Sequence, residues 1–373
     1  MKLFKKLLAK KPQRPAGYEG FWHWFAEKET NLYAAIEDGE DIPNNVLYPI
    51  ANELRKLREG YLPLVGMPVD GVAELVFTAS GLVKNFVFMD DLVERAPELD
   101  NWKFTALKPA MDPAQFGINM HELNFSQEKM KFFAVQHEKY PDLIHLKFTH
   151  EDATEDNLQQ VQEGVLVYLQ HILGEENYLS IIDQVDVILE DEVNDDLIPI
   201  EKLDEYLLWR QKEFIEKYEG FRHNTEQDNY GVYEALMESG NRQLATLNTD
   251  LLQWDKKASH PWMLIIAIQY ETTRDDRLPD EETGELLNTF EDRLLAELKD
   301  SDGYLNIGRE SCNGIREIYF ACQEVRDCSR TVDRMLRLYR NHFKGDYAIY
   351  KDKYWRTFAS YDAGATTASD EQE

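Results

Sequence analysis

Hydrophobic and polar residues are most regularly ordered between residues 259 and 355. Residues 262–270 form a run of nine mostly apolar residues, which is typical of a strand buried in a sheet. Apolar residues at helical spacing then predict a helix, and Asp280 stands where it can cap the first turn. This stretch therefore begins with a strand followed by a helix.

The second half of the same stretch predicts a hairpin, a helix and a last strand. Residues 304–322 form two strands joined at Asn313-Gly314, a dipeptide that accepts the two positive φ values of a type I′ turn. Ser329 can cap the next helix, and residues 347–351 form the last strand. The order β-α-β-β-α-β is the ferredoxin-like plan, so the predicted fold class is α+β. A fold does not by itself name a function.

One or two further α+β units are predicted upstream. An aromatic cluster at residues 21–25 opens a helix and is expected to lie in a core, and residues 73–78 and 83–89 are strand-like. Residues 132–189 predict the order strand, strand, helix, strand, which resembles part of the C-terminal plan. An amphipathic helix over residues 200–218 follows.

The junction with the C-terminal domain is predicted from polarity. Residues 219–231 are polar and suit a linker, and residues 232–254 predict a helix that leads into the domain. A chain of 373 residues exceeds what one hydrophobic core usually supports, so several domains are expected. We predict a basic N-terminal segment, an N-terminal α+β unit, an acidic middle α+β unit, a ferredoxin-like domain and a disordered tail. Their boundaries are residues 1–20, 21–110, 111–219, 220–358 and 359–373.

The net charge of the chain is large and unevenly distributed along the sequence, and it bears on the choice of partner. The net charge is −29, and residues 111–219 contribute −17 from 8 basic and 25 acidic residues. Such a field disfavours binding to DNA and would favour a basic protein partner, although solubility alone also explains acidity of this kind. The densest run of carboxylates is Glu190-Asp191-Glu192 with Asp195-Asp196.

The compartment is inferred from the cysteines and from hydrophobic run lengths. Cys312, Cys322 and Cys328 form neither a disulfide framework nor a zinc spacing. No run approaches the roughly 20 apolar residues of a membrane span. Residues 1–11 alternate apolar residues with lysines at helical spacing, which fits either contact with a membrane surface or a frayed helix. We expect a cytoplasmic protein.

Motifs that would name a reaction are missing from the sequence. Neither a phosphate-binding glycine loop nor a Gly-x-Ser-x-Gly elbow occurs. His145 and His150 lie beside acidic residues, but a spacing of five on a strand directs them to opposite faces. His260, before Pro261, suits a backbone-capping role. We therefore predict no catalytic residue, no cofactor and no metal site.

One basic feature stands out in this acidic chain. Arginines on the second C-terminal helix form a ridge opposite its apolar face: Arg326, Arg330, Arg334 and Arg337, flanked by Arg340. The ridge could dock an acidic helix, another copy of the chain or an RNA backbone. It could equally be a solvated face whose arginines pair with nearby carboxylates.

Several C-terminal segments carry a resemblance to a known family. They are HPWMLIIAIQYE, the acidic helix with Glu291-Asp292, GIREIYFACQEV and DKYW. They resemble the bacterial family catalogued as domain of unknown function 695, whose members end in an Asp-Pro-x-Trp motif. Here Asp352 and Trp355 match that motif, and Lys353 stands at the proline position.

The resemblance extends beyond these segments. FWHWF and NWKF, near the N-terminus, are similar to a region that accompanies this domain in some members. The family implies an α+β, ferredoxin-like domain and brings no established activity or catalytic residues. A more distant, fold-level likeness is to regulator of ribonuclease activity B, an acidic ferredoxin-like protein that inhibits an endoribonuclease by binding it.

Three functional hypotheses follow. The first is a cytoplasmic, non-enzymatic binding or regulatory protein that uses its acidic surfaces to engage a basic protein. The alternative is an enzyme of unrecognised type, with its site between the middle and C-terminal domains. The third is self-association, in which the arginine ridge docks on an acidic face of another copy.

Overall fold

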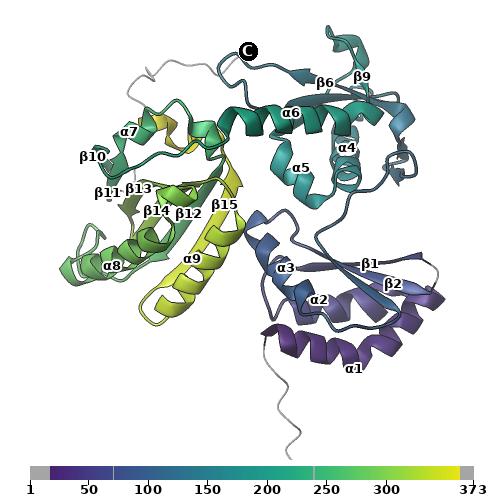
Figure 1. Ribbon diagram of the computed structural model, residues 1–373, viewed down its shortest axis with the longest axis horizontal. Coiled ribbons are helices and arrows are strands. Elements are labelled where there is room, and N and C mark those ends of the chain that lie inside the picture. The colour runs from purple at the N-terminus through teal and green to yellow at the C-terminus, as the bar shows by residue number, and fades with distance from the viewer. Residues whose placement is uncertain (1–16, 70, 238–239, 362–373) are drawn as a thin grey trace, which may run out of the picture. The chain divides into compact units, whose positions relative to one another are not determined.

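The computed structural model describes residues 17–69, 71–237 and 240–361, and it has a mixed α+β fold with several sheets (Figure 1). Two compact units divide the chain, residues 1–109 and residues 110–373. Most of the predicted basic segment, residues 1–16, lies outside the described residues, as does the predicted tail from residue 362.

The first unit combines helices with a three-stranded sheet. The helices are α1 (Gly17–Asp38), α2 (Tyr48–Leu54), preceded by a π-helical turn (Pro43–Leu47), and α3 (Phe86–Glu94). The strands are β1 (Leu62–Val69), β2 (Val72–Thr78) and β3 (Trp102–Ala106). β2 is central, antiparallel to β1 and parallel to β3. Phe21, Trp22 and Phe25 of α1 are buried, so the aromatic cluster supplies core residues as predicted.

The strand predicted for residues 83–89 is wrong. Val83–Asn85 forms a 3-10 turn that leads directly into α3. All of these residues except Lys84 are buried. A continuously buried run has no hydrophobic period that could distinguish a strand from a helix.

The middle part of the second unit is built on a four-stranded sheet. Its strands are β6 (Met130–Val135), β7 (His145–His150), β8 (Gln184–Val187) and β9 (Ile198–Pro199), in the order β8-β7-β6-β9. A small hairpin of β4 (Ile118–Met120) and β5 (Leu123–Phe125) precedes it. α4 (Leu158–Ile172) and α5 (Glu175–Ile181) lie on one face of the sheet, and α6 (Leu203–Tyr218) follows β9 (Figure 1). The predicted order of strands and helix is present, with α5 as an addition.

The C-terminal part contains the predicted elements in the predicted order. They are β12 (Trp262–Gln269), α8 (Glu281–Glu297), β13 (Tyr304–Cys312), β14 (Ile315–Cys322), α9 (Arg326–Tyr339) and β15 (Lys344–Lys351). α8 and α9 lie side by side on one face of the sheet (Figure 1). Trp355, Phe358 and a short helix, α7 (Thr249–Leu252), pack on the other face.

The predicted turn and helix caps of this part can be compared with the structure at single residues. Asn313 and Gly314 have φ of 55° and 80°, as the hairpin requires. The Asp280 side chain accepts a hydrogen bond from the Thr283 N–H, which confirms that cap. Ser329 is not a cap, because α9 begins three residues earlier and the Glu324 carboxylate accepts from its first N–H groups.

The helix predicted for residues 232–254 is also wrong, except for the short α7 at its end. β10 (Tyr230–Leu236) and β11 (Arg242–Asn248) pair as an antiparallel hairpin and extend the sheet to the order β10-β11-β13-β14-β12-β15. Alternate residues such as Ala245 and Leu247 face the core, which a strand satisfies and a helix would not. Gly240, at φ 81°, forms the turn between the strands.

Candidate functional site

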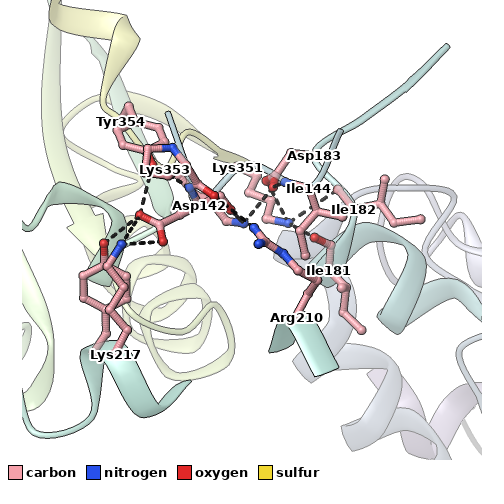
Figure 2. Close-up of polar contacts among 12 residues, drawn as sticks. Asp142, Ile144, Ile181, Ile182, Asp183, Arg210, Lys217, Lys351, Lys353 and Tyr354 are labelled. Carbon is pink, nitrogen blue, oxygen red and sulfur yellow. Dashed lines mark hydrogen bonds and ion pairs between the residues drawn. The ribbon is translucent and has the colours of Figure 1, made fainter. Parts of the chain in front are cut away.

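A cluster of buried charges joins the end of β15 to the middle part of the chain (Figure 2). Asp183 follows α5, and its two carboxylate oxygens accept from Lys351 at 2.9 Å and from Lys353 at 2.7 Å. The three side chains are only 5–11% exposed. We call Asp183, Lys351 and Lys353 the lysine clasp.

Backbone carbonyls complete the surroundings of both ammonium groups. Lys351 also donates to the carbonyl oxygens of Ile181 at 2.9 Å and Ile182 at 3.4 Å. Lys353 donates to the Asp142 carbonyl oxygen at 2.7 Å. The end of α5 leaves carbonyl groups without helical partners, and a cation there satisfies them and matches the helix dipole.

A second carboxylate, Asp142, lies beside the clasp in the turn between β6 and β7 (Figure 2). It accepts from Lys217 at 2.7 Å, from the Tyr218 hydroxyl at 2.8 Å and from the Tyr354 hydroxyl at 3.0 Å. Burial acts to raise the pKa of Asp142, but these donors outweigh it and lower the pKa overall. Asp142 is therefore held as an anion that ties α6 to the segment after β15.

Burial dominates the chemistry of Lys351. Loss of hydration lowers the pKa of its ammonium group to about 8, and the charge of Asp183 opposes that shift. Burial together with the charge of Asp142 raises the pKa values of Tyr218 and Tyr354. Near neutral pH Asp142 is thus an anion, and Tyr218 and Tyr354 are neutral phenols.

A cavity of about 500 Å³ opens beside the clasp. Its polar lining includes Gln162, Gln184 and Arg356, and its apolar lining includes Leu166 and Tyr178. Gln162 donates to the Val185 carbonyl oxygen and Gln184 to Asp186. Asp352, also in the lining, accepts from the N–H groups of Arg356 and Thr357 and so caps the last 3-10 helix.

These contacts decide what the cavity can do. Each N–H of Lys351 has an acceptor, and the Asp183 carboxylate holds both lysines and the Ile144 N–H. Groups engaged in this way support a surface and are poorly placed to attack a substrate. The arrangement is that of a structural junction with a cavity at its side.

The arginine ridge predicted from the sequence is held in intramolecular ion pairs. The pairs are Arg326 with Glu176, Arg330 with Asp327, Arg334 with Glu297, and Arg337 with Asp333. Arg340 is exposed at the C-terminus of α9. The Arg326 pair is bidentate, at 2.7 and 3.1 Å, and links α9 to α5. A docking role for the ridge stays a prediction.

The two histidines considered as metal ligands, His145 and His150, bind different partners. Within residues 17–69, 71–237 and 240–361, no group of three or more His, Cys, Asp or Glu could hold a metal ion. His150 bonds to the Asn124 carbonyl oxygen, whereas His145 bonds to Asp186 and to His137. In the same part of the chain, no helix is long and apolar enough to cross a bilayer.

The lysine clasp was not predicted from the sequence. Lys351, Asp183 and Asp142 lie far apart in the sequence, and each belongs to a residue type common in this chain. One signal was present: Lys353 stands where the resemblance places a proline. Its neighbours Asp352 and Trp355 match the motif; Trp355 is buried and its indole N–H donates to the His260 carbonyl oxygen at 3.0 Å.

Comparison with known proteins finds one family model that the C-terminal part of the chain matches. Residues 228–361 match the model of a family of unknown function, DUF695, which confirms the resemblance seen in the sequence. No curated protein and no solved structure matches the chain. The fold-level likeness to regulator of ribonuclease activity B stays a prediction.

Proposed function

We propose that this chain, with its C-terminal domain from a family of unknown function, is a cytoplasmic binding or regulatory protein that engages a basic protein partner. The contact lies on an acidic surface, defined by the exposed carboxylates of residues 190–205. These are Glu190, Asp191, Glu192, Asp195, Asp196, Glu201, Asp204 and Glu205. With one basic residue, Lys202, in the same range, eight negative charges and one positive charge give −7.

The observation that most directly supports this proposal is a pair of exposed apolar side chains beside these carboxylates. Leu208 and Trp209 of α6 are 64% and 56% exposed. Asp204 and Glu205 precede them by four residues, so each apolar side chain has a carboxylate one turn away on the same helix face. Large apolar residues with a charged surround are typical of protein interfaces, where tryptophan often contributes most of the affinity.

Charge identifies the class of partner. Two of the eight carboxylates pair with lysines, Glu190 with Lys131 and Glu205 with Lys202, and these pairs are exposed. Exposed ion pairs contribute little, so a partner's lysine or arginine can replace them readily. Nucleic acid and anionic lipid would be repelled by the same surface.

The compartment and the domain plan belong to the same proposal. Cys312, Cys322 and Cys328 are free thiols, which fits a reducing compartment. The antiparallel order β13-β14-β12-β15 supports the ferredoxin-like plan predicted for residues 220–358.

A pull-down at low salt tests the function. The full chain, immobilised, should retain one or more basic proteins from a lysate. The variant Leu208→Ser/Trp209→Ser should lose them, with a fall in affinity of at least about 30-fold expected for an interface anchor. A matched control, Leu295→Ser, removes a 39% exposed leucine on α8 and should retain the same proteins. Retention of no basic protein, or equal retention by all three chains, would refute the proposal.

A second candidate function has one specific observation in its favour. The cavity lies between the middle and C-terminal parts, where the enzyme alternative places its site, and the amine of Lys351 has a pKa lowered to about 8. An amine of this kind can act as a nucleophile when a substrate displaces its partners. Screening metabolites by thermal shift against the wild type and Lys351→Met tests this candidate. It requires a compound that stabilises the wild type alone.

A further inference from the structure

The outer edge of the six-stranded sheet is open at β10. β10 is the last strand in the order, and no strand among the described residues pairs with its outer side. Val232 and Leu236 are 70% and 74% exposed, and Tyr230 is 49% exposed. An unpaired strand with exposed apolar side chains is a template for the addition of another strand.

The pairing with β11 shows which backbone groups face outward. The Asn229 carbonyl oxygen accepts from the Thr249 N–H at 2.9 Å, and the Met237 N–H donates to the Asn241 carbonyl oxygen at 2.9 Å. Antiparallel pairs alternate, so odd-numbered residues of β10 bond to β11. The N–H and C=O groups of the even-numbered residues, 230 to 236, therefore point to the open edge.

Other sheet edges of this chain carry features that discourage strand addition. β1 contains Pro63 and Pro68, and β9 has two residues, one of them Pro199. β15 carries the charges of Lys344 and Asp346. Prolines, short strands and charged side chains all block edge pairing. β10 has seven residues, contains neither proline nor lysine, and has Glu234 as its one charged residue.

We propose that β10 pairs antiparallel with β10 of a second copy of this chain. A twofold axis at Tyr233 brings even-numbered residues opposite even-numbered residues, as the outward-facing groups require. Tyr230 then lies opposite Leu236 of the second copy, and Val232 lies opposite its Glu234. The pair of Tyr230 with Leu236, an aromatic residue opposite an apolar one, is of a kind that stabilises neighbouring strands.

Local charge favours a second copy over a basic segment at this edge. Glu234 already pairs with Arg242 of its own chain at 2.9 Å, so the edge is close to neutral and does not select a basic strand. A twofold axis at Glu234 would place the Glu234 side chains of the two copies opposite each other, and their like charges would destabilise the dimer. The axis at Tyr233 avoids this contact. The dimer is therefore independent of the acidic surface used for the basic partner.

Size and net charge set the behaviour of this dimer. One pair of seven-residue strands buries less area than a standard stable interface, so the dimer is weak and depends on concentration. Each copy has a net charge of −29, and added salt screens the repulsion between copies. Salt should therefore strengthen the dimer, whereas it weakens binding of a basic partner.

Sedimentation equilibrium of the full chain over a wide concentration range tests the pairing. The wild type should pass from monomer to dimer, with the transition at lower concentration in higher salt. Val232→Lys/Leu236→Lys should stay monomeric, because two lysines at an edge oppose strand addition. The control Ile215→Lys/Leu295→Lys makes the same charge change on exposed residues of α6 and α8 and should dimerise like the wild type. Circular dichroism verifies that both variants are folded.

Disulfide trapping tests the register independently. Two copies of residue 233 at the axis form a non-hydrogen-bonded pair with Cα atoms about 4.5 Å apart, a distance that a disulfide spans. The two copies of residue 234 would be about 8 Å apart, which is too far. In a Cys312→Ser background, oxidation should therefore trap Tyr233→Cys as a dimer and leave Glu234→Cys monomeric. A monomeric wild type at all concentrations, a dimer that survives the lysine changes, or equal trapping of both cysteines would overturn the proposal.

Discussion

Asp183 is the residue on which the buried junction depends. Its carboxylate compensates two ammonium groups that are almost fully removed from water. Removal of one partner from a buried ion pair typically destabilises a protein by about 3–5 kcal/mol, because the remaining charge stays buried without a counter-ion. We therefore expect Asp183→Ala to lower the free energy of unfolding by about that amount, measured by urea denaturation.

The size of this effect separates the clasp from a surface ion pair. Glu205→Ala breaks the exposed pair with Lys202 and should leave the urea midpoint unchanged. If Asp183→Ala also left the urea midpoint unchanged, the clasp would contribute nothing to the stability of the fold.

His260 makes stability depend on pH. Its ring is fully buried, the Ser259 hydroxyl donates to the Lys256 carbonyl oxygen, and the ring Nδ1 lies 2.9 Å from the same hydroxyl. Nδ1 is therefore the protonated nitrogen, and Nε2 has no hydrogen-bond partner among residues 17–69, 71–237 and 240–361. Burial, assisted by the positive charge of Arg222, lowers the pKa of His260 to about 3.

The sign of the pH effect follows from these two states. The unfolded chain binds a proton at His260 below its ordinary pKa of about 6.5, whereas the folded chain stays neutral until about pH 3. Stability due to this residue is present above pH 6.5 and is lost as the pH falls toward 3. Between pH 7 and 5 the loss is about 2 kcal/mol.

Comparison with a variant isolates the contribution of this histidine. The advantage of the wild type over His260→Gln in urea denaturation should shrink by that amount when the pH falls from 7 to 5. Gln253 is exposed in the same unit and does not titrate, so the difference between wild type and Gln253→Ala should stay constant. Parallel pH profiles for wild type and His260→Gln would contradict this account.

At the scale of elements, Gly308 allows β13 and β11 to approach closely. Its φ is 135°, and a Cβ atom there would lie 2.1 Å from the Thr246 carbonyl oxygen. Gly308→Ala should lower the free energy of unfolding by at least about 2 kcal/mol, measured by thermal or urea denaturation.

A second glycine supplies the matched control. Gly284 lies within α8, and a Cβ atom there would meet nothing within 4 Å. Gly284→Ala should stabilise the protein by about 0.5–1 kcal/mol, because alanine loses less backbone entropy in a helix. A stabilising or neutral Gly308→Ala would show that the two strands can separate without loss.

Elements with local signals could be predicted from the sequence, and elements fixed by distant contacts could not. Asn313-Gly314 and Asp280 act through residues next to them, so the hairpin and the start of α8 are as predicted. β10 and β11 are strands because they extend a sheet whose other members lie far along the chain. Tertiary pairing of this kind overrides local propensity.

The same reasoning explains why the candidate site was not predicted. Lys351 and Lys353 meet Asp183 across about 170 residues, and lysine and aspartate are both common residue types in this chain. The acidic run at residues 190–196 was visible because its charges are consecutive. Leu208 and Trp209 were hidden in an ordinary amphipathic helix, and only their exposure distinguishes them.

For the whole molecule, net charge links the two proposed interfaces with opposite sign. In the proposed contacts, a basic partner would bind by attraction to the acidic surface, and a second copy would bind at β10 against the repulsion between two chains of net charge −29. Salt should therefore favour the dimer and disfavour the complex.

The affinity of a retained basic protein for the full chain, measured as a function of NaCl concentration, tests the central claim most directly. The account predicts tight binding at about 50 mM salt that weakens steeply by about 500 mM. Asp204→Lys/Glu205→Lys should lose most of the low-salt affinity and much of the salt dependence. Binding through the acidic surface would be contradicted by an affinity that does not change with salt concentration. It would also be contradicted if Asp204→Lys/Glu205→Lys bound with the affinity of the wild type.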